Sequence, residues 1–130
     1  MGNIDFIKMH GLGNDFVIID KRTNFIKITK DLIKKLSDRR SGVGCDQLIT
    51  IEGSKDTNIH ANITIFNPKG DKAEACGNGT RCVAKILFDE LKLNQIQILS
   101  NAGILKAKKI DSNNISVNLG KLTTHWKNIP

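Results

Sequence analysis

Short stretches in which apolar and polar residues alternate run along much of the chain, and this pattern predicts β-strands. The clearest stretch places Ile115, Val117 and Leu119 on one face and polar residues on the other. The first two strands would be joined by a turn, His10–Asn14, in which two glycines permit positive φ angles. The expected strands are Ile4–Met9, Phe16–Asp20, Leu48–Glu52, Asn62–Phe66, Gln95–Ser100, Ile104–Ile110 and Asn114–Leu119.

Two further segments have the spacing of a helix. Asp31–Arg40 is predicted to form a short amphipathic helix, which a glycine-containing loop, Ser41–Gly44, brings to an end. Between Thr80 and Leu91, apolar residues cover most of a helix's circumference, which is typical of a buried helix. Several strands and one buried helix together predict an α+β fold, with a mostly antiparallel sheet curled around one buried central helix.

The composition is typical of a single globular domain. The chain has 130 residues, of which 39% are hydrophobic and 25% charged, without a linker, repeat or low-complexity tract. No apolar run approaches the roughly 20 residues that cross a bilayer, and the N-terminus lacks a secretory signal. We therefore expect a cytoplasmic protein without membrane contact, in which Cys45, Cys76 and Cys82 are reduced thiols.

The net charge of +7 raises the alternative of a basic nucleic-acid-binding domain. The chain has no Tyr, its five Phe residues lie in apolar contexts, and no basic cluster alternates with aromatic residues to stack bases. Scattered lysines more often form solvated faces, so we expect no nucleic-acid partner. The three histidines are widely separated, and none lies near a cysteine at metal-ligand spacing, which predicts no metal site.

The most informative stretch, Cys76-Gly77-Asn78-Gly79, comes directly before the predicted buried helix. Unpaired N–H groups and the helix dipole would form a site here for an anionic group such as a carboxylate or phosphate. The same field is expected to lower the pKa of the Cys76 thiol toward neutrality, as needed to abstract a proton from a bound amino acid. The alternative reading of the local pattern is a capped tight turn beside a buried, unreactive cysteine.

Four blocks of the sequence resemble the signatures of diaminopimelate epimerases, in the family's order and at its approximate spacing. Together they cover most of the chain and are far more specific than any one block alone. The blocks are Lys8–Phe16, Gly42–Leu48, Ile65–Gly70 and Ala75–Cys82. The resemblance implies an isomerase of lysine and cell-wall precursor synthesis that interconverts LL- and meso-diaminopimelate without pyridoxal phosphate, metal or other cofactor.

The resemblance also implies roles for particular residues. In the family, two cysteines on opposite faces of the substrate's α-carbon act as thiolate base and thiol acid, and Cys76 matches the first of them. The substrate-binding positions are matched by Asn14, Gln47 and Asn67, with Gly77 and Asn78 as the backbone cradle for the substrate's carboxylate. Proline racemases and isomerases of the phenazine-biosynthesis type, which share the fold, are the alternatives.

Two carboxylates adjoin these predicted binding positions. Asp15 follows Asn14, and Asp46 precedes Gln47. Aspartates in such places commonly hydrogen-bond to nearby backbone groups. We expect Asp15 and Asp46 to brace the turns and not to act as bases.

The second cysteine of the family has no counterpart in this chain. Family members resemble two related halves with the active site between them, and residues 1–130 resemble only the first half. Cys82 lies on the same helix as Cys76, and Cys45 occupies a variable position of its block, so neither fills the gap. We expect an N-terminal domain that does not epimerise diaminopimelate alone, with the related second domain absent from this chain. Its partner would be the C-terminal half of the same enzyme or, as a less favoured alternative, a second copy in a homodimer.

Overall fold

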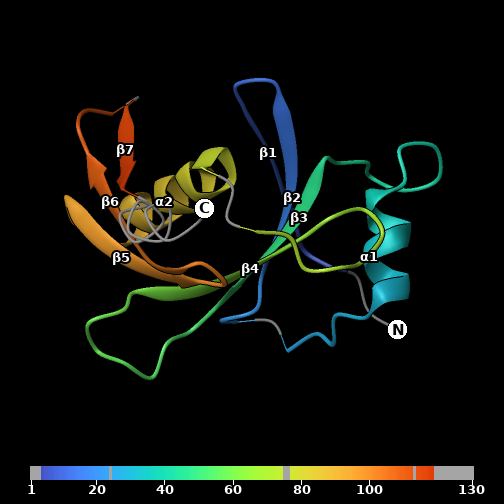
Figure 1. Ribbon diagram of the computed structural model, residues 1–130, viewed down its shortest axis with the longest axis horizontal. Helices are drawn as coiled ribbons and strands as arrows, with labels where there is room; N and C mark the ends of the chain where they lie inside the picture. Colours follow the sequence, from blue (N-terminus) through green and yellow to red (C-terminus); the bar gives the residue numbers. More distant parts are fainter. Residues whose placement is uncertain (1–3, 24, 75–76, 113, 119–130) are drawn as a thin grey trace, which may run out of the picture.

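The computed structural model describes residues 4–23, 25–74, 77–112 and 114–118. Two helices and seven strands follow one another along these residues (Figure 1). The helices are α1 (Lys30–Ser37) and α2 (Gly77–Leu91). The strands are β1 (Ile7–Gly11), β2 (Asn14–Asp20), β3 (Gln47–Glu52), β4 (Ala61–Phe66), β5 (Gln95–Ser100), β6 (Gly103–Lys109) and β7 (Ile115–Asn118). Neither of these helices is long and apolar enough to span a membrane.

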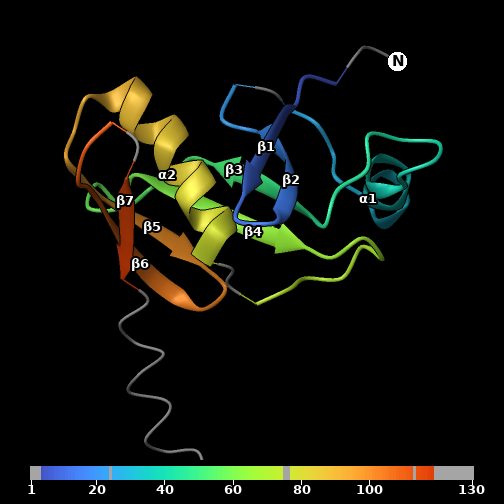
Figure 2. The ribbon, with the colours of Figure 1, turned by 90° about the horizontal axis from the view of Figure 1, so that it is seen from above.

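The seven strands form one sheet in which they lie side by side in chain order, from β1 to β7. The pairs β2–β3 and β4–β5 are parallel, and the other four pairs are antiparallel. Parallel neighbours need a crossover connection, and α1 and α2 lie in these two connections. The sheet curls so that both β1 and β7 contact α2 (Figure 1 and Figure 2). The predicted α+β fold, a mostly antiparallel sheet around a central helix, is confirmed.

The main hydrophobic core lies between α2 and the inner face of the sheet. Val83, Leu87 and Phe88 of the helix are buried there against side chains of the curled sheet. A second, smaller core lies on the other face of β2 and β3, where α1 packs Ile33 against Val17. Because β2 and β3 are covered on both faces, each has four buried residues in a row, residues 16–19 in β2 and 48–51 in β3.

The start of α2 differs from the prediction. The helix begins at Gly77, so the segment 77–79 forms its first turn and is not a loop before it. Its solvent-facing side carries Arg81, Lys85 and Asp89, which are exposed and four residues apart. The helix is therefore buried where the sheet covers it and exposed along one stripe, a result that the run of apolar residues did not indicate.

The end of α1 also differs from the prediction. The helix begins after Thr29, whose side-chain oxygen accepts a hydrogen bond from the N–H of Leu32 at 3.1 Å. It ends at Ser37 instead of Arg40, because the carboxylate of Asp38 accepts a hydrogen bond from the N–H of Arg40 at 2.8 Å and closes a turn. This early end leaves the chain free to run back toward the start of β3.

The first hairpin is tighter than expected. β1 starts at Ile7 and continues to Gly11, and only Leu12 and Gly13 separate it from β2. Both residues have positive φ, 36° and 92° respectively, as two-residue hairpin turns require. The remaining predicted strands agree with the structure to within two residues at each end, and Leu119 lies outside the described residues.

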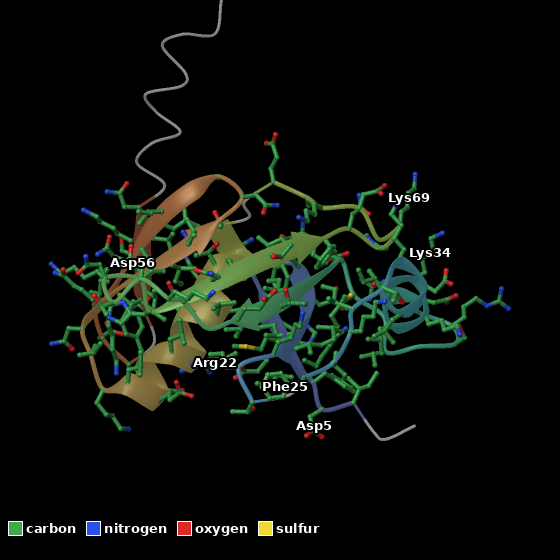
Figure 3. The ribbon with its side chains drawn as sticks, turned by 90° about the horizontal axis from the view of Figure 1, so that it is seen from below. Asp5, Arg22, Phe25, Lys34, Asp56 and Lys69 are labelled. Carbon is green, nitrogen blue, oxygen red and sulfur yellow. The ribbon has the colours of Figure 1, made fainter. Side chains whose placement is uncertain are left out.

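An ion pair ties α1 to the loop that follows β4. The ammonium group of Lys30 lies 2.8 Å from the carboxylate of Asp71. Figure 3 shows Lys34 of α1 and Lys69 of the loop on the same side of the molecule. These two lysines and Lys30 together hold the pKa of the Asp71 carboxyl below its usual value, mainly through the hydrogen bond from Lys30. The loop after β4 is thus held against a helix that packs on the sheet.

The first turn of α2 approaches the sheet closely at Gly79. A Cβ atom on this residue would lie 2.8 Å from Cδ1 of Ile49 and 3.2 Å from Cε1 of Phe16. We predict that Gly79→Ala lowers the free energy of unfolding by about 1–3 kcal/mol, because the added methyl overpacks the core. Chemical denaturation measures the effect. Gly77→Ala is the matched control, since a Cβ there meets nothing within 4 Å; equal losses in both variants would contradict the close approach.

Candidate active site

The predicted substrate-binding residues come from segments that meet at one end of the strands. β2 and β3 are parallel and pair Phe16 with Gln47, so both strands begin at this end. β4 runs antiparallel to β3 and pairs Phe66 with Leu48, so β4 finishes there. The predicted residues at this end are Asn14 at the start of β2, Gln47 at the start of β3, and Asn67 directly after β4.

The N-terminus of α2 reaches the same place. The side-chain Nδ2 of Asn78, in the first turn of α2, donates a hydrogen bond to Oδ1 of Asn14 at 3.1 Å. A Cβ atom on Gly11 would lie 3.5 Å from the Cβ of Asn78, so the end of β1 lies directly against the helix (Figure 2). Two predicted binding residues that are 64 positions apart are therefore in direct contact. Cys76, the predicted catalytic residue, lies outside the described residues.

The start of α2 is electrically positive. The first N–H groups of an α-helix have no acceptor within the helix, and the helix dipole adds a partial positive charge at this end. The first turn carries no acidic residue, and the guanidinium of Arg81 adds a full positive charge nearby. Its Nη1 donates a hydrogen bond to Oδ1 of Asn78 at 2.9 Å. An anionic group such as a carboxylate is the ligand that this arrangement favours.

Two aspartates clamp the starts of β2 and β3 together. The N–H of Asp15 donates to Oδ2 of Asp46 at 3.0 Å, and the N–H of Asp46 donates to Oδ1 of Asp15 at 2.8 Å. The guanidinium of Arg39 bridges both carboxylates, at 2.8 Å from Asp15 and 3.0 Å from Asp46. Lys8 forms an ion pair with Asp15 at 2.8 Å and also donates to the carbonyl of Gly44. We refer to the reciprocal pair of aspartates as the Asp15–Asp46 clamp.

The surroundings of Asp15 keep its carboxyl group ionised. Hydrogen bonds from the Arg39 guanidinium lower its pKa most, burial opposes this shift, and Lys8 lowers the pKa further. The net effect holds the pKa of Asp15 far below its usual range. Such a weakly basic carboxylate is unsuited to proton abstraction at neutral pH. Asp15 and Asp46 brace the turns beside Asn14 and Gln47, as the sequence indicated.

Asn67 is held by its own loop. Its side-chain Oδ1 accepts hydrogen bonds from the N–H groups of Lys69, at 3.0 Å, and Asp71, at 3.1 Å. This Asx-type turn fixes the direction of the side chain, and it leaves the amide Nδ2 as the group suited to donate to a ligand. Gln47 is partly buried at the start of β3. The register of the sheet brings it to the same end as Asn67 and Asn14.

The roles of Arg39 and Lys8 could not be predicted from the sequence. The sequence points to such cations only indirectly. Asp15 and Asp46 adjoin binding positions, and two neighbouring carboxylates need a cation to neutralise them. The chain has 20 Lys and Arg residues, and Arg39 lies 24 positions from Asp15. Only the fold shows which cation pairs with Asp15. Because α1 ends at Ser37, the chain after it brings Arg39 back toward β3.

Of two cavities in the structure, one adjoins the predicted site and the other lies away from it. A cavity of about 190 Å³ adjoins Asn78 and Arg81, between β1 and the start of α2. A larger one of about 500 Å³ lies at β5, β6 and β7 and contains none of the predicted residues. Of the predicted residues that the structure describes, Asn78 lines the smaller of these two cavities, and none lines the larger one.

The role of the clamp predicts how stability depends on pH. Asp15→Asn should lower the free energy of unfolding by about 2 kcal/mol at neutral pH, because charged hydrogen bonds are lost. The folded pKa lies below the unfolded value of about 3.9, so the stabilisation is complete above that value and is lost as pH falls toward the folded pKa. Thermal unfolding from about pH 7 to about pH 3 should show the difference from the parent chain shrinking on the acid side.

An exposed aspartate serves as the control for this series. Asp5 is exposed and points to solvent (Figure 3), so Asp5→Asn should change the free energy of unfolding by less than about 0.5 kcal/mol. A constant difference between Asp15→Asn and the parent chain across the acid range would show that ionisation of Asp15 does not support the fold.

Known proteins match the chain along almost its whole length. The model of the diaminopimelate epimerase family matches residues 6–125. The diaminopimelate epimerase of Pelagibacter ubique (strain HTCC1062) is 45% identical over 128 residues, which cover 98% of this chain and 46% of that protein. The chain spans about half the length of the curated relatives that it matches.

Solved structures with low sequence identity share the fold. Methylitaconate-delta-isomerase superposes with a TM-score of 0.66 at 15% identity, over 83% of this chain and 35% of that one. A phenazine biosynthesis protein of the PhzF family from Enterococcus faecalis has a TM-score of 0.58 at 15% identity, over 76% of this chain and 35% of that one. At such identities the likeness establishes the fold and nothing about the reaction.

Proposed function

This chain belongs to the diaminopimelate epimerase family, and we propose that it supplies one side of an active site that interconverts LL- and meso-diaminopimelate. In this proposal Cys76 is one of two acid/base groups, and Asn14, Gln47, Asn67 and the start of α2 bind the substrate. The observation that carries it is the meeting of Asn14 and Asn78 at the positive end of α2.

The chemistry of epimerisation suits this arrangement. The Cα–H bond of the amino acid is broken, its proton passes to the thiolate sulfur of Cys76, and the electron pair stays on the carbon. A thiol on the opposite face then gives its own proton to that carbon, which inverts the configuration. The α-proton is very weakly acidic, so the developing negative charge needs donors that are already in place. The N–H groups and dipole at the start of α2 would supply them to the substrate's carboxylate.

The neutral amides suit a zwitterionic substrate. An Asn or Gln side chain offers both a donor and an acceptor, so it holds either an ammonium or a carboxylate group without adding a charge. Within the site, the aspartates of the Asp15–Asp46 clamp are neutralised by Arg39 and Lys8. This neutralisation supports a mechanism in which the thiol is the base and the two carboxylates do not transfer protons.

We further infer that the second thiol comes from a second, related half of the enzyme. The chain spans about half of its curated relatives, and the two described cysteines, Cys45 and Cys82, are buried in the two cores. Buried thiols of this kind pack as small apolar side chains. We place the enzyme in the cytoplasm, where thiols stay reduced.

The 130-residue chain alone should therefore fail to turn over diaminopimelate. Incubation of the chain with either isomer in deuterated water, followed by mass spectrometry, should show neither epimerisation nor deuterium at the α-carbon. Addition of the second half should restore both. Full turnover by the chain alone would refute this prediction, and a rate that rises with the square of chain concentration would identify a homodimer as the active form.

In the assembled enzyme, Cys76→Ala should abolish epimerisation, because no group remains to take or give the proton on that face. We expect a loss of at least about a thousandfold in kcat, in keeping with removal of an essential acid/base group. Cys82→Ala is the matched control on the same helix, where the thiol is buried in the core. Retained epimerisation in the Cys76 variant would show that another residue transfers the proton on that face.

A further inference from the structure

Four side chains at the candidate site form a continuous series of hydrogen bonds in which each donates to the next. Arg81 donates to Oδ1 of Asn78 at 2.9 Å, and Nδ2 of Asn78 donates to Oδ1 of Asn14 at 3.1 Å. Nδ2 of Asn14 in turn donates to Oδ2 of Asp46 at 3.4 Å. We refer to this series, from Arg81 to Asp46, as the amide relay.

The two ends of the amide relay fix its direction. A guanidinium can only donate hydrogen bonds and a carboxylate can only accept them. The oxygen of Asn78 must therefore face Arg81, and the amino group of Asn14 must face Asp46. Rotation of either amide by 180° would bring donor against donor or acceptor against acceptor. An isolated asparagine has no such preference, so the charged ends determine how both amides are oriented.

The acceptor end is itself held in place. Oδ2 of Asp46 also accepts the N–H of Asp15 at 3.0 Å, and its Oδ1 accepts a hydrogen bond from Arg39 at 3.0 Å. Both oxygens of Asp46 are thus tied to the starts of β2 and β3 through the Asp15–Asp46 clamp. The donor end is tied through the helix, because Arg81 and Asn78 are three residues apart on one face of α2.

We propose that Arg81 and Asp46 are positioning residues that orient the Asn14 and Asn78 amides before the substrate arrives. The inference rests on the function proposed above and deepens it. Each amide uses one N–H and one oxygen lone pair for hydrogen bonds within the relay. Its second N–H and second lone pair then point in a defined direction. The substrate would then meet a site with a fixed hydrogen-bond polarity and would not have to reorient the amides on binding.

The relay can be tested in the chain itself, without any enzyme activity. In Arg81→Met, the side-chain amide resonances of both Asn78 and Asn14 should shift in nitrogen–proton correlation spectra, although Arg81 contacts only Asn78. In Arg81→Lys, which keeps a donor, the Asn14 resonances should stay near their original positions. The amide of Asn67, whose oxygen is held by its own turn, should not move in either variant.

Lys85→Met is the matched control for these spectra. Lys85 lies one turn further along the exposed side of α2 and carries the same charge, so this variant removes one positive charge from the same face of the helix but leaves the relay intact. Shifts confined to Asn78 in Arg81→Met, or equal shifts of Asn14 in Lys85→Met, would overturn the proposal.

The functional consequence is measured in the assembled enzyme. Arg81→Met should raise KM for diaminopimelate about tenfold, the effect of weakening a hydrogen bond in the site, while the melting temperature stays unchanged because Arg81 is exposed. Lys85→Met should leave KM unchanged, and Arg81→Lys should recover most of the loss. An unchanged KM in Arg81→Met would refute the positioning role. If the parent enzyme lacked epimerase activity altogether, the proposed function would fail, and the spectra alone would decide whether the relay exists.

Discussion

The packing of the first turn of α2 against β2 and β3 is the constraint on which the candidate site depends. Gly79 allows it, because any larger side chain would press on Ile49 and Phe16. The close approach brings the positive end of the helix to the place where β2 and β3 begin. A helix held one side chain further from the sheet would separate Asn78 from Asn14. The position of the helix's positive end and that of the amides beside it therefore depend on one contact in the core.

The second requirement is that charges near this helix end be neutralised. A partly buried carboxylate is costly unless cations and N–H groups compensate it. Asp15 meets this requirement through Arg39, Lys8 and the backbone of Asp46. As a result, the clamp holds two strand starts together without placing an uncompensated negative charge beside a site for an anionic ligand. The aspartates stabilise the framework, and the neutral amides remain as the groups proposed to face the ligand.

Local patterns predicted the elements well, and the contacts between them poorly. Alternation located β7, because burial on one face of a strand leaves a direct trace in sequence. The helical start at Gly77 was missed, since a Gly-Asn-Gly segment has low helix propensity and forms a turn only where tertiary packing favours it. The partnership of Arg39 with Asp15 leaves no local trace at all. Asn14 and Asn78 were identified by resemblance, and their direct contact required the fold.

The chain-order arrangement of the sheet has a consequence for how the molecule folds. Each strand pairs with its neighbour in sequence, so the antiparallel pairs form across short connections, whereas the parallel pairs β2–β3 and β4–β5 close only across α1 and α2. The contact between Asn14 and Asn78 closes a segment of 64 residues and needs the helix to be docked first. The two amides of the candidate site therefore meet only when α2 packs on the sheet, so assembly of the site is tied to formation of the main core.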